Sequence, residues 1–122
     1  MIVTHVNDGQ KAPFSVKGST VTVGSVSIDL QERQTSIQKV IDVCLDNQLQ
    51  TMREGLGAWY VATIILPPVQ EEVYDTGELD ENGEVVYKTR PLPLDLGKVE
   101  LRLWGLPTEY GQEQPIEEGV TE

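Results

Sequence analysis

The side chains that most often carry out chemistry are scarce in this sequence. His5 is the only histidine and Cys44 the only cysteine, so neither an intrachain disulfide nor a zinc site rich in thiolate or imidazole ligands can form within one chain. A single histidine could still serve as a base or a pH switch. Cys44 falls within a regularly spaced series of apolar residues, where a cysteine packs as a small hydrophobic side chain. We therefore expect both residues to be structural, with no metal or cofactor.

One acidic stretch has the oxygen ligands that calcium prefers. Glu78-Leu79-Asp80-Glu81-Asn82-Gly83 places oxygen-bearing side chains before a glycine. An EF-hand register starting at this point would need aspartate at its first position and a bidentate glutamate at its twelfth, which here are Glu78 and Thr89. The pair Asn82-Gly83 is equally explained as a hairpin turn. We predict no dedicated metal site, and weak surface binding of calcium stays an open alternative.

Other chemistry is limited to carboxylates and aromatic rings. The sequence contains no P-loop, dinucleotide fingerprint or nucleophile elbow, and no pair of its many acids is distinguished as a catalytic pair. Aromatic side chains could stack on a sugar or anchor a protein interface. Trp104 follows the alternation of Glu100 and Arg102, which places it on the less buried face of its strand, whereas the usual heavy burial of tryptophan favours a core or edge-covering position over an exposed one.

The charge is unevenly distributed. The net charge is −11, and seven of the twenty acids lie between Glu71 and Glu84, with five more beyond Pro107. Nucleic acid is excluded as an expected partner, because neutralising phosphates requires clustered Lys and Arg. No segment approaches the roughly 20 apolar residues of a membrane-spanning helix, and no secretory signal is seen. We expect no membrane contact and a cytoplasmic location.

The elements that position these residues are organised around the apolar run from Gly57 to Pro68. Both of its alternating faces are apolar, which is typical of a central strand. On one face we place Trp59, Val61 and Ile65; on the other we place Tyr60, Ala62, Ile64 and Leu66.

Residues 13–30 predict a three-stranded meander. Apolar residues alternate with polar ones, and turns at Gly18-Ser19 and Gly24-Ser25 put Val16 opposite Val21 and Val23 opposite Val26. From about 36 to 53, apolar residues recur three and four positions apart, which indicates one amphipathic helix. The residues of this stripe are Ile37, Val40, Ile41, Cys44, Leu45, Leu49 and Met52.

The second half of the chain predicts a projecting acidic β-arm at about 69–90, a hairpin that turns at Asn82-Gly83. A strand from Lys98 to Trp104 follows, and residues 107–122 have the composition of an acidic disordered tail. We therefore predict one α+β domain over 1–106, with a mainly antiparallel sheet system of six to eight strands and one helix packed on a face.

For function, the absence of a chemical constellation and the projecting arm favour a non-enzymatic protein–protein interaction module, or a structural subunit of an oligomeric assembly. Small structural proteins of phage and prophage particles have this general character, although no motif of such a family is present. The partner would be another protein or a second copy. The alternatives are a β-rich carbohydrate-binding module using exposed aromatics and, third, a carboxylate acid/base enzyme. The candidate interaction residues are Tyr74, Glu78, Asp80, Glu81, Tyr87 and Trp104.

Overall fold

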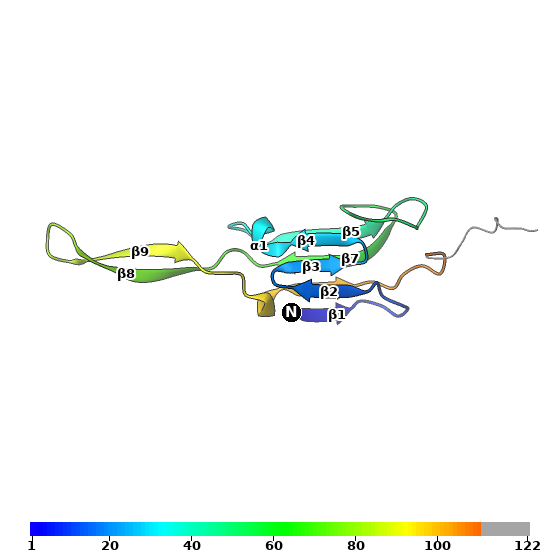
Figure 1. The fold of residues 1–122 in the computed structure, drawn as a ribbon, viewed down its shortest axis with the longest axis horizontal. Helices are drawn as coiled ribbons and strands as arrows, with labels where there is room; N and C mark the ends of the chain where they lie inside the picture. The colour runs from blue at the N-terminus through cyan, green and yellow to red at the C-terminus, as the bar shows by residue number, and fades with distance from the viewer. Residues whose placement is uncertain (111–122) are drawn as a thin grey trace, which may run out of the picture.

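The computed structural model describes residues 1–110, which form mostly β-sheet with few helical residues. Three sheets are present (Figure 1): a five-stranded sheet in the order β1-β10-β7-β5-β6, the three-stranded sheet β2-β3-β4, and the two-stranded sheet β8-β9. All strand pairs are antiparallel except β1 with β10. The strands are β1 (Ile2–His5), β2 (Phe14–Lys17), β3 (Thr20–Val23), β4 (Val26–Asp29), β5 (Lys39–Leu45), β6 (Met52–Glu54), β7 (Trp59–Leu66), β8 (Glu71–Leu79), β9 (Val85–Pro91) and β10 (Glu100–Leu103).

The meander and its register are confirmed. Val16 lies opposite Val21, and Val23 lies opposite both Phe14 and Val26. The turns use Gly18 and Gly24, whose φ angles of 62° and 56° are in the region that favours glycine. The strands β3 and β4 bury their apolar side chains, whereas those of β2, an edge strand of its sheet, stay partly exposed.

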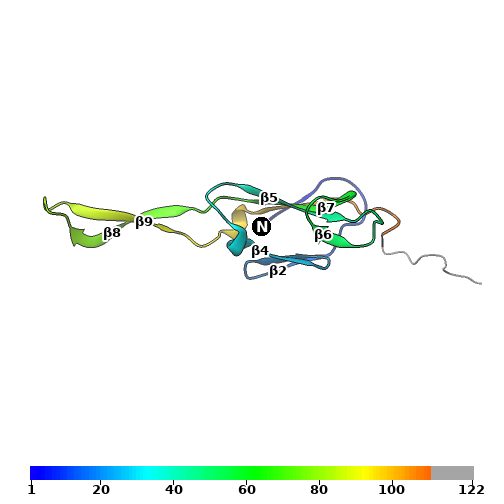
Figure 2. The same ribbon diagram turned by 90° about the horizontal axis from the view of Figure 1, so that it is seen from above.

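The meander forms a second layer on one face of the five-stranded sheet, as Figure 2 shows. The apolar core lies between these two layers, with Val21, Val23 and Ile28 from the meander packed among residues of β5, β7 and β10. This packing covers one face of the large sheet. In the described part of the chain, no helix is long and apolar enough to cross a membrane.

The strand β7 is central, as predicted, but the prediction of its faces is wrong. Val43 of β5 pairs with Ala62, and the next residue, Cys44, pairs with Tyr60, so Val61 is the extra residue of a β-bulge. Val61 and Ala62 are both fully buried. The bulge therefore reverses the alternation, and Tyr60 falls on the same face as Thr63 rather than with the core residues.

The helix predicted over about 36–53 is wrong, because this stretch forms β5, a turn and β6. Three successive residues of β5, Val43 to Leu45, are buried, and Val43 lies off the predicted helical stripe. Successive residues of a strand point to opposite faces, so a strand beside a bulged neighbour can bury consecutive residues. The apolar stripe of a helix instead buries residues three and four positions apart. The β-branched residues of β5 also favour a strand.

A turn after β5 stops any continuous helix. The carboxylate of Asp46 accepts hydrogen bonds from the backbone N–H groups of Gln50 (3.0 Å) and Thr51 (3.3 Å). Leu49 has a φ of 60°, which is incompatible with a right-handed helix. The α-helix of the structure is instead α1 (Leu30–Arg33), which Asp29 caps by accepting a hydrogen bond from the N–H of Glu32; η1 (Leu96–Lys98) is a short 3₁₀ turn.

The strands β8 and β9 form a hairpin that extends away from the two packed layers (Figures 1 and 2). We call it the arm. A two-residue turn at Asn82-Gly83 would set the carboxylates of Glu81 and Glu84 opposite each other, which favours a looser tip. The tip is looser, because Leu79 pairs with Val85 and only Gly83 of the turn has a positive φ, of 80°. After β10, the chain from Pro107 to Tyr110 makes a turn in which the N–H of Tyr110 donates to the carbonyl of Pro107. The rest of the predicted tail, 111–122, lies outside the described residues.

Candidate functional site: the open face of the central sheet

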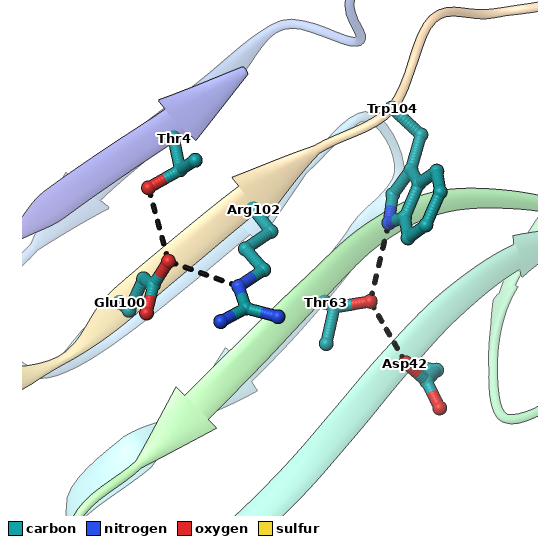
Figure 3. Close-up of polar contacts among 6 residues, drawn as sticks. All are labelled: Thr4, Asp42, Thr63, Glu100, Arg102 and Trp104. Atoms are coloured by element: carbon teal, nitrogen blue, oxygen red, sulfur yellow. Dashed lines mark hydrogen bonds and ion pairs between the residues drawn. The ribbon is translucent and has the colours of Figure 1, made fainter. Parts of the chain in front are cut away.

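The face of the five-stranded sheet that points away from the meander carries an unusual set of side chains, which we call the open face. Residues directly opposite each other on neighbouring strands share a face. One row of the open face therefore runs Thr4–Arg102–Thr63–Asp42 across β1, β10, β7 and β5, and the next row runs Ile2–Glu100–Ile65–Val40. Figure 3 shows six residues of this region: five on these four strands, and Trp104, which directly follows β10.

A chain of hydrogen bonds crosses the centre of the open face. The indole Nε1 of Trp104 donates to the hydroxyl of Thr63 at 3.3 Å, and this hydroxyl donates to Oδ1 of Asp42 at 2.9 Å (Figure 3). Thr63 is only 9% exposed although it faces away from the core. Its hydroxyl is therefore held between a donor and a charged acceptor, which fixes the orientation of both neighbours.

A second polar group occupies the β1–β10 side. The carboxylate of Glu100 accepts hydrogen bonds from the hydroxyl of Thr4 (3.0 Å) and from Nε of Arg102 (2.9 Å). The hydrogen bond from Arg102, followed by that from Thr4, lowers the pKa of Glu100. The contact with Glu100 uses one nitrogen of the Arg102 guanidinium, and within the described residues its two terminal nitrogens make no hydrogen bond to protein. Arg102 therefore presents free donors at the surface.

Two aromatic rings stack on the open face. Tyr60 and Trp104 have ring centroids 5.3 Å apart and planes inclined by 26°. Trp104 is half-buried, as expected for a residue on the less buried face, and its backbone N–H donates to the carbonyl of Val61 at the bulge. Tyr60 remains 43% exposed. The bulge thus turns Tyr60 towards Trp104, and without it the tyrosine would point into the core.

Gly105 secures the segment that carries Trp104. Its N–H donates to the side-chain oxygen of Asn7 at 2.6 Å, and its carbonyl accepts from Nε1 of Trp59 at 2.8 Å. A Cβ atom at this position would overlap the carbonyl oxygen of Asp8. The close approach of two backbone segments therefore requires glycine here, and it sets the position of the neighbouring indole.

Apolar side chains flank these polar and aromatic groups. Val40 is 57% exposed and Ile2 is 53% exposed, while Ile65 between them is half-buried. Tryptophan, tyrosine and arginine next to exposed aliphatic residues are the composition of a protein-interaction surface, in which these three residue types dominate the binding energy.

The structure separates the six predicted interaction residues into two groups. Trp104 lies on the open face, and the other five lie on the arm. Tyr74 packs under the guanidinium of Arg90, 4.6 Å from the ring centroid, whereas Tyr87 is 61% exposed. The carboxylate of Asp80 accepts hydrogen bonds from two backbone N–H groups of the tip, at Asn82 (2.8 Å) and Glu84 (2.9 Å), so Asp80 shapes the turn.

The remaining two predicted arm residues, Glu78 and Glu81, have exposed side chains. Among the described residues, no group of three or more His, Cys, Asp or Glu side chains could hold a metal ion. His5 lies on the edge strand β1, and Cys44 is buried beside Gly57, where burial raises the pKa of its thiol.

Sequence reasoning did not single out Asp42, Thr63 or Arg102 as site residues. The sequence does contain a sign of this site. Asp42 and Thr63 each interrupt an apolar run, and together with Arg102 they place a polar side chain at the same level of three neighbouring strands. That level can be recognised only when the strand pairing is known, and the helix predicted over β5 removed Asp42 from the sheet.

Comparison with known proteins identifies no relative: no family model, curated protein or solved structure matches this chain. The fold and site alone define its class, which is a two-layer β protein with one uncovered sheet face and a projecting hairpin.

Proposed function

We propose that this chain is a non-enzymatic protein–protein interaction subunit of an assembly, and that it binds its partner through the open face of the five-stranded sheet. The observation that carries the proposal is that the central strand of this sheet is covered on one face by the meander, while the other face presents Tyr60, Trp104, Arg102 and Val40. Antiparallel sheets with one solvated face normally alternate apolar-in and polar-out. This open face departs from that pattern.

The size of the face supports the same function. The 26 residues of its five strands, at a rise of about 3.4 Å and a strand spacing of about 4.8 Å, give an area of roughly 420 Å². A stable protein interface buries about 800 Å² on each partner. The open face supplies about half of this area, and contacts made by the arm would supply the rest.

The arm adds a second argument. A two-stranded hairpin is at best marginally stable in water on its own. This one lies away from the core and leaves Val73 (67%), Leu79 (66%) and Tyr87 (61%) exposed. Contact with a partner would bury these side chains and hold the hairpin in place.

A cross-linking experiment with the full chain tests the function. The chain is incubated with extract of its source cells, and cross-linked peptides are mapped by mass spectrometry for the wild type, for Tyr60→Asp and for the control Ser15→Asp, which places the same charge on an exposed residue of β2. We expect specific cross-links around the open face, to another protein or to a second copy, that Tyr60→Asp abolishes and Ser15→Asp retains. Association that survives Tyr60→Asp, or cross-links that never map to this face, would refute the proposal.

A carbohydrate-binding module is a second candidate because the Tyr60–Trp104 pair is partly exposed. The two rings stack on each other, which leaves less ring surface for a sugar. The cavity of about 390 Å³ that Lys11, Leu106 and Tyr110 help to line does not include either ring. Titration of tryptophan fluorescence with a panel of sugars decides between a protein partner and a carbohydrate. A saturable shift that is lost in Tyr60→Ala would favour the carbohydrate.

A carboxylate enzyme has weaker support. A general acid at neutral pH needs a raised pKa. Among the described residues, the carboxyl groups whose pKa departs from its usual value, those of Asp46, Glu54 and Glu100, are all shifted downwards by hydrogen bonds.

A further inference from the structure

We infer that the partner of the open face is a second copy of this chain, related to the first by a two-fold axis nearly parallel to β7. This inference rests on the proposed function and names its partner. It comes from the distribution of charge along one row of the open face, Arg102–Thr63–Asp42, in which a cation and an anion lie on opposite sides of the central strand.

The strand register makes this row complementary to itself. Arg102 and Asp42 are both directly opposite Thr63, on β10 and β5 respectively. A two-fold axis that runs along β7 between two stacked open faces exchanges the two sides of the sheet. It therefore places β10 of one copy above β5 of the other, at the same level along the strands. Each Arg102 then faces an Asp42 of the other copy, and the contact occurs twice.

The atoms needed for this contact are free in the single chain. Asp42 accepts the hydroxyl of Thr63 at Oδ1, and within residues 1–110 its Oδ2 makes no hydrogen bond to protein. The terminal nitrogens of Arg102 are equally unused over the same residues. Within residues 1–110 the two side chains form no ion pair with each other: their strands lie on either side of β7, and Nε of Arg102 is engaged by Glu100. A charged donor and a charged acceptor thus remain available on one half-buried surface.

The distances between packed sheets suit this pair. Packed sheets lie about 10 Å apart, a gap that an arginine and an aspartate side chain can span together. Their strands cross at about 30°, so the axis bisects this angle and lies about 15° from the direction of β7, and at one strand spacing from the axis the crossing displaces a residue by only about 2.5 Å. Thr63 and Ile65 lie on the axis, where Ile65 meets Ile65 of the other copy, and the exposed Val40 faces Glu100 on β10 of the other copy.

An axis across the strands does not give the same complementarity. Placed over Thr63, it would put Arg102 against Arg102 of the other copy. Placed one residue further along, it would put Arg102 against Glu100 of the other copy, a carboxylate that already accepts from Arg102 of its own chain, and would leave Asp42 against Val40. The lengthwise axis also makes both arms extend from the same end of the dimer. Each arm is acidic, but at 0.15 M salt charges more than about 8 Å apart are largely screened, so a small splay of the arms removes their repulsion.

A charge-swap experiment tests the pair directly. Sedimentation velocity of the full chain at concentrations up to about 1 mM should show a dimer, a range that covers weak interfaces. We expect R102E and D42K each to raise the dissociation constant by about 100-fold or more, because each variant places like charges together twice. An equimolar mixture of the two variants should form a heterodimer, since both of its contacts then join opposite charges.

The mixture separates an intermolecular pair from a fold defect. If either variant shows altered circular dichroism, the milder pair R102Q and D42N replaces it, and each should weaken the dimer by about tenfold or more. A strictly monomeric wild type would overturn the inference. So would a dimer that is unaffected by either substitution, or single variants whose mixture stays monomeric.

The direction of the axis is tested with spin labels on the arm. Glu81→Cys gives one accessible thiol at the tip, since the native Cys44 is buried. Each arm is about 30 Å long, so an axis across the strands would separate the tips by more than about 60 Å. A measured tip-to-tip distance below this value supports the lengthwise axis, and a longer distance overturns it. A wild type that is monomeric alone but cross-links to a different protein at the open face refutes the second copy and leaves the proposed function standing.

Discussion

Replacing Thr63 by valine is the most direct test of how the open face is held together. Valine keeps the shape and the β-branch of threonine but removes the hydroxyl that accepts from Trp104 and donates to Asp42. A hydrogen bond to a charged group contributes about 1.5–3 kcal/mol to stability. Because Asp42 is half-exposed, water can hydrogen-bond to its carboxylate in the variant and recover part of this free energy. The bond from Trp104, at 3.3 Å, is long and adds about 0.5 kcal/mol. We expect a loss of about 1–2 kcal/mol in the free energy of unfolding.

The assay is urea unfolding followed by circular dichroism at one low protein concentration, because any dimer would make stability depend on concentration. The matched control is Thr22→Val, which removes a hydroxyl that pairs with Ser27 at 2.9 Å on the meander, where both groups are neutral. It should change stability by less than about 0.5 kcal/mol. A double-mutant cycle of Thr63→Val with Asp42→Ala should give a coupling of about 0.5–1 kcal/mol.

A fixed hydrogen-bond chain through Thr63 is refuted if Thr63→Val loses no more free energy of unfolding than Thr22→Val, or if the double-mutant cycle gives no coupling. Either result would mean that solvent satisfies Asp42 and Trp104 as well as the hydroxyl does. The open face would then be a set of independent side chains and not a fixed surface.

Three further predictions concern the rest of the fold. The hydrogen bond from Arg33 lowers the pKa of Glu54, so their exposed ion pair stabilises the protein by about 0.5–1 kcal/mol above the unfolded pKa of about 4.3. Urea unfolding at pH 7 should show this loss in Arg33→Gln, and the difference from the wild type should shrink as the pH falls through the lowered pKa of Glu54. Gly105→Ala should destabilise the protein by about 1–3 kcal/mol or more, measured by urea unfolding, because the added methyl group overlaps the backbone of Asp8. Cys44 should react with a thiol reagent only after unfolding, since burial protects it and raises its pKa; rapid reaction in the native protein would contradict its placement.

Much of the fold follows from local patterns in the sequence. The meander was predictable because its turns and its alternation specify the same register, and a one-residue slip would expose Val21 and Val23. The central position of β7 agrees with its continuous apolar run, which is typical of a strand inside a sheet, although only one of its two faces is covered, by the meander.

The β5 region was mispredicted because its sequence satisfies two periods. The spacing of Val40, Ile41, Cys44 and Leu45 fits a helix, yet it also fits a strand opposite the Val61 bulge. The turn residues Asp46-Asn47 and the β-branched content are the local signals that favour the strand. Pairing with β7, whose partner residues lie 14 or more positions away in the chain, decides between the two, and that pairing is not visible in a local pattern.

The open face was only partly predictable, for a related reason. Trp104 was correctly placed on the less buried face by alternation with Glu100 and Arg102. The bulge at Val61, however, moves Tyr60 to the other face of its strand, and no local pattern in the sequence predicts this bulge. The row formed by Arg102, Thr63 and Asp42 exists only after three strands from distant parts of the chain have paired.

The parallel pairing of β1 with β10 has a consequence for how the molecule is made. The hydroxyl of Thr4 meets the carboxylate of Glu100 across 96 positions of sequence. The meander and the arm, by contrast, are hairpins that close through short turns, and such local contacts form much faster than distant ones. A chain emerging from the ribosome therefore completes its hairpins early, while β1 has no neighbour and one edge of β7 stays unpaired. The four residues of β10 fill both positions at once, so the last strand of the described residues is the one that closes the five-stranded sheet.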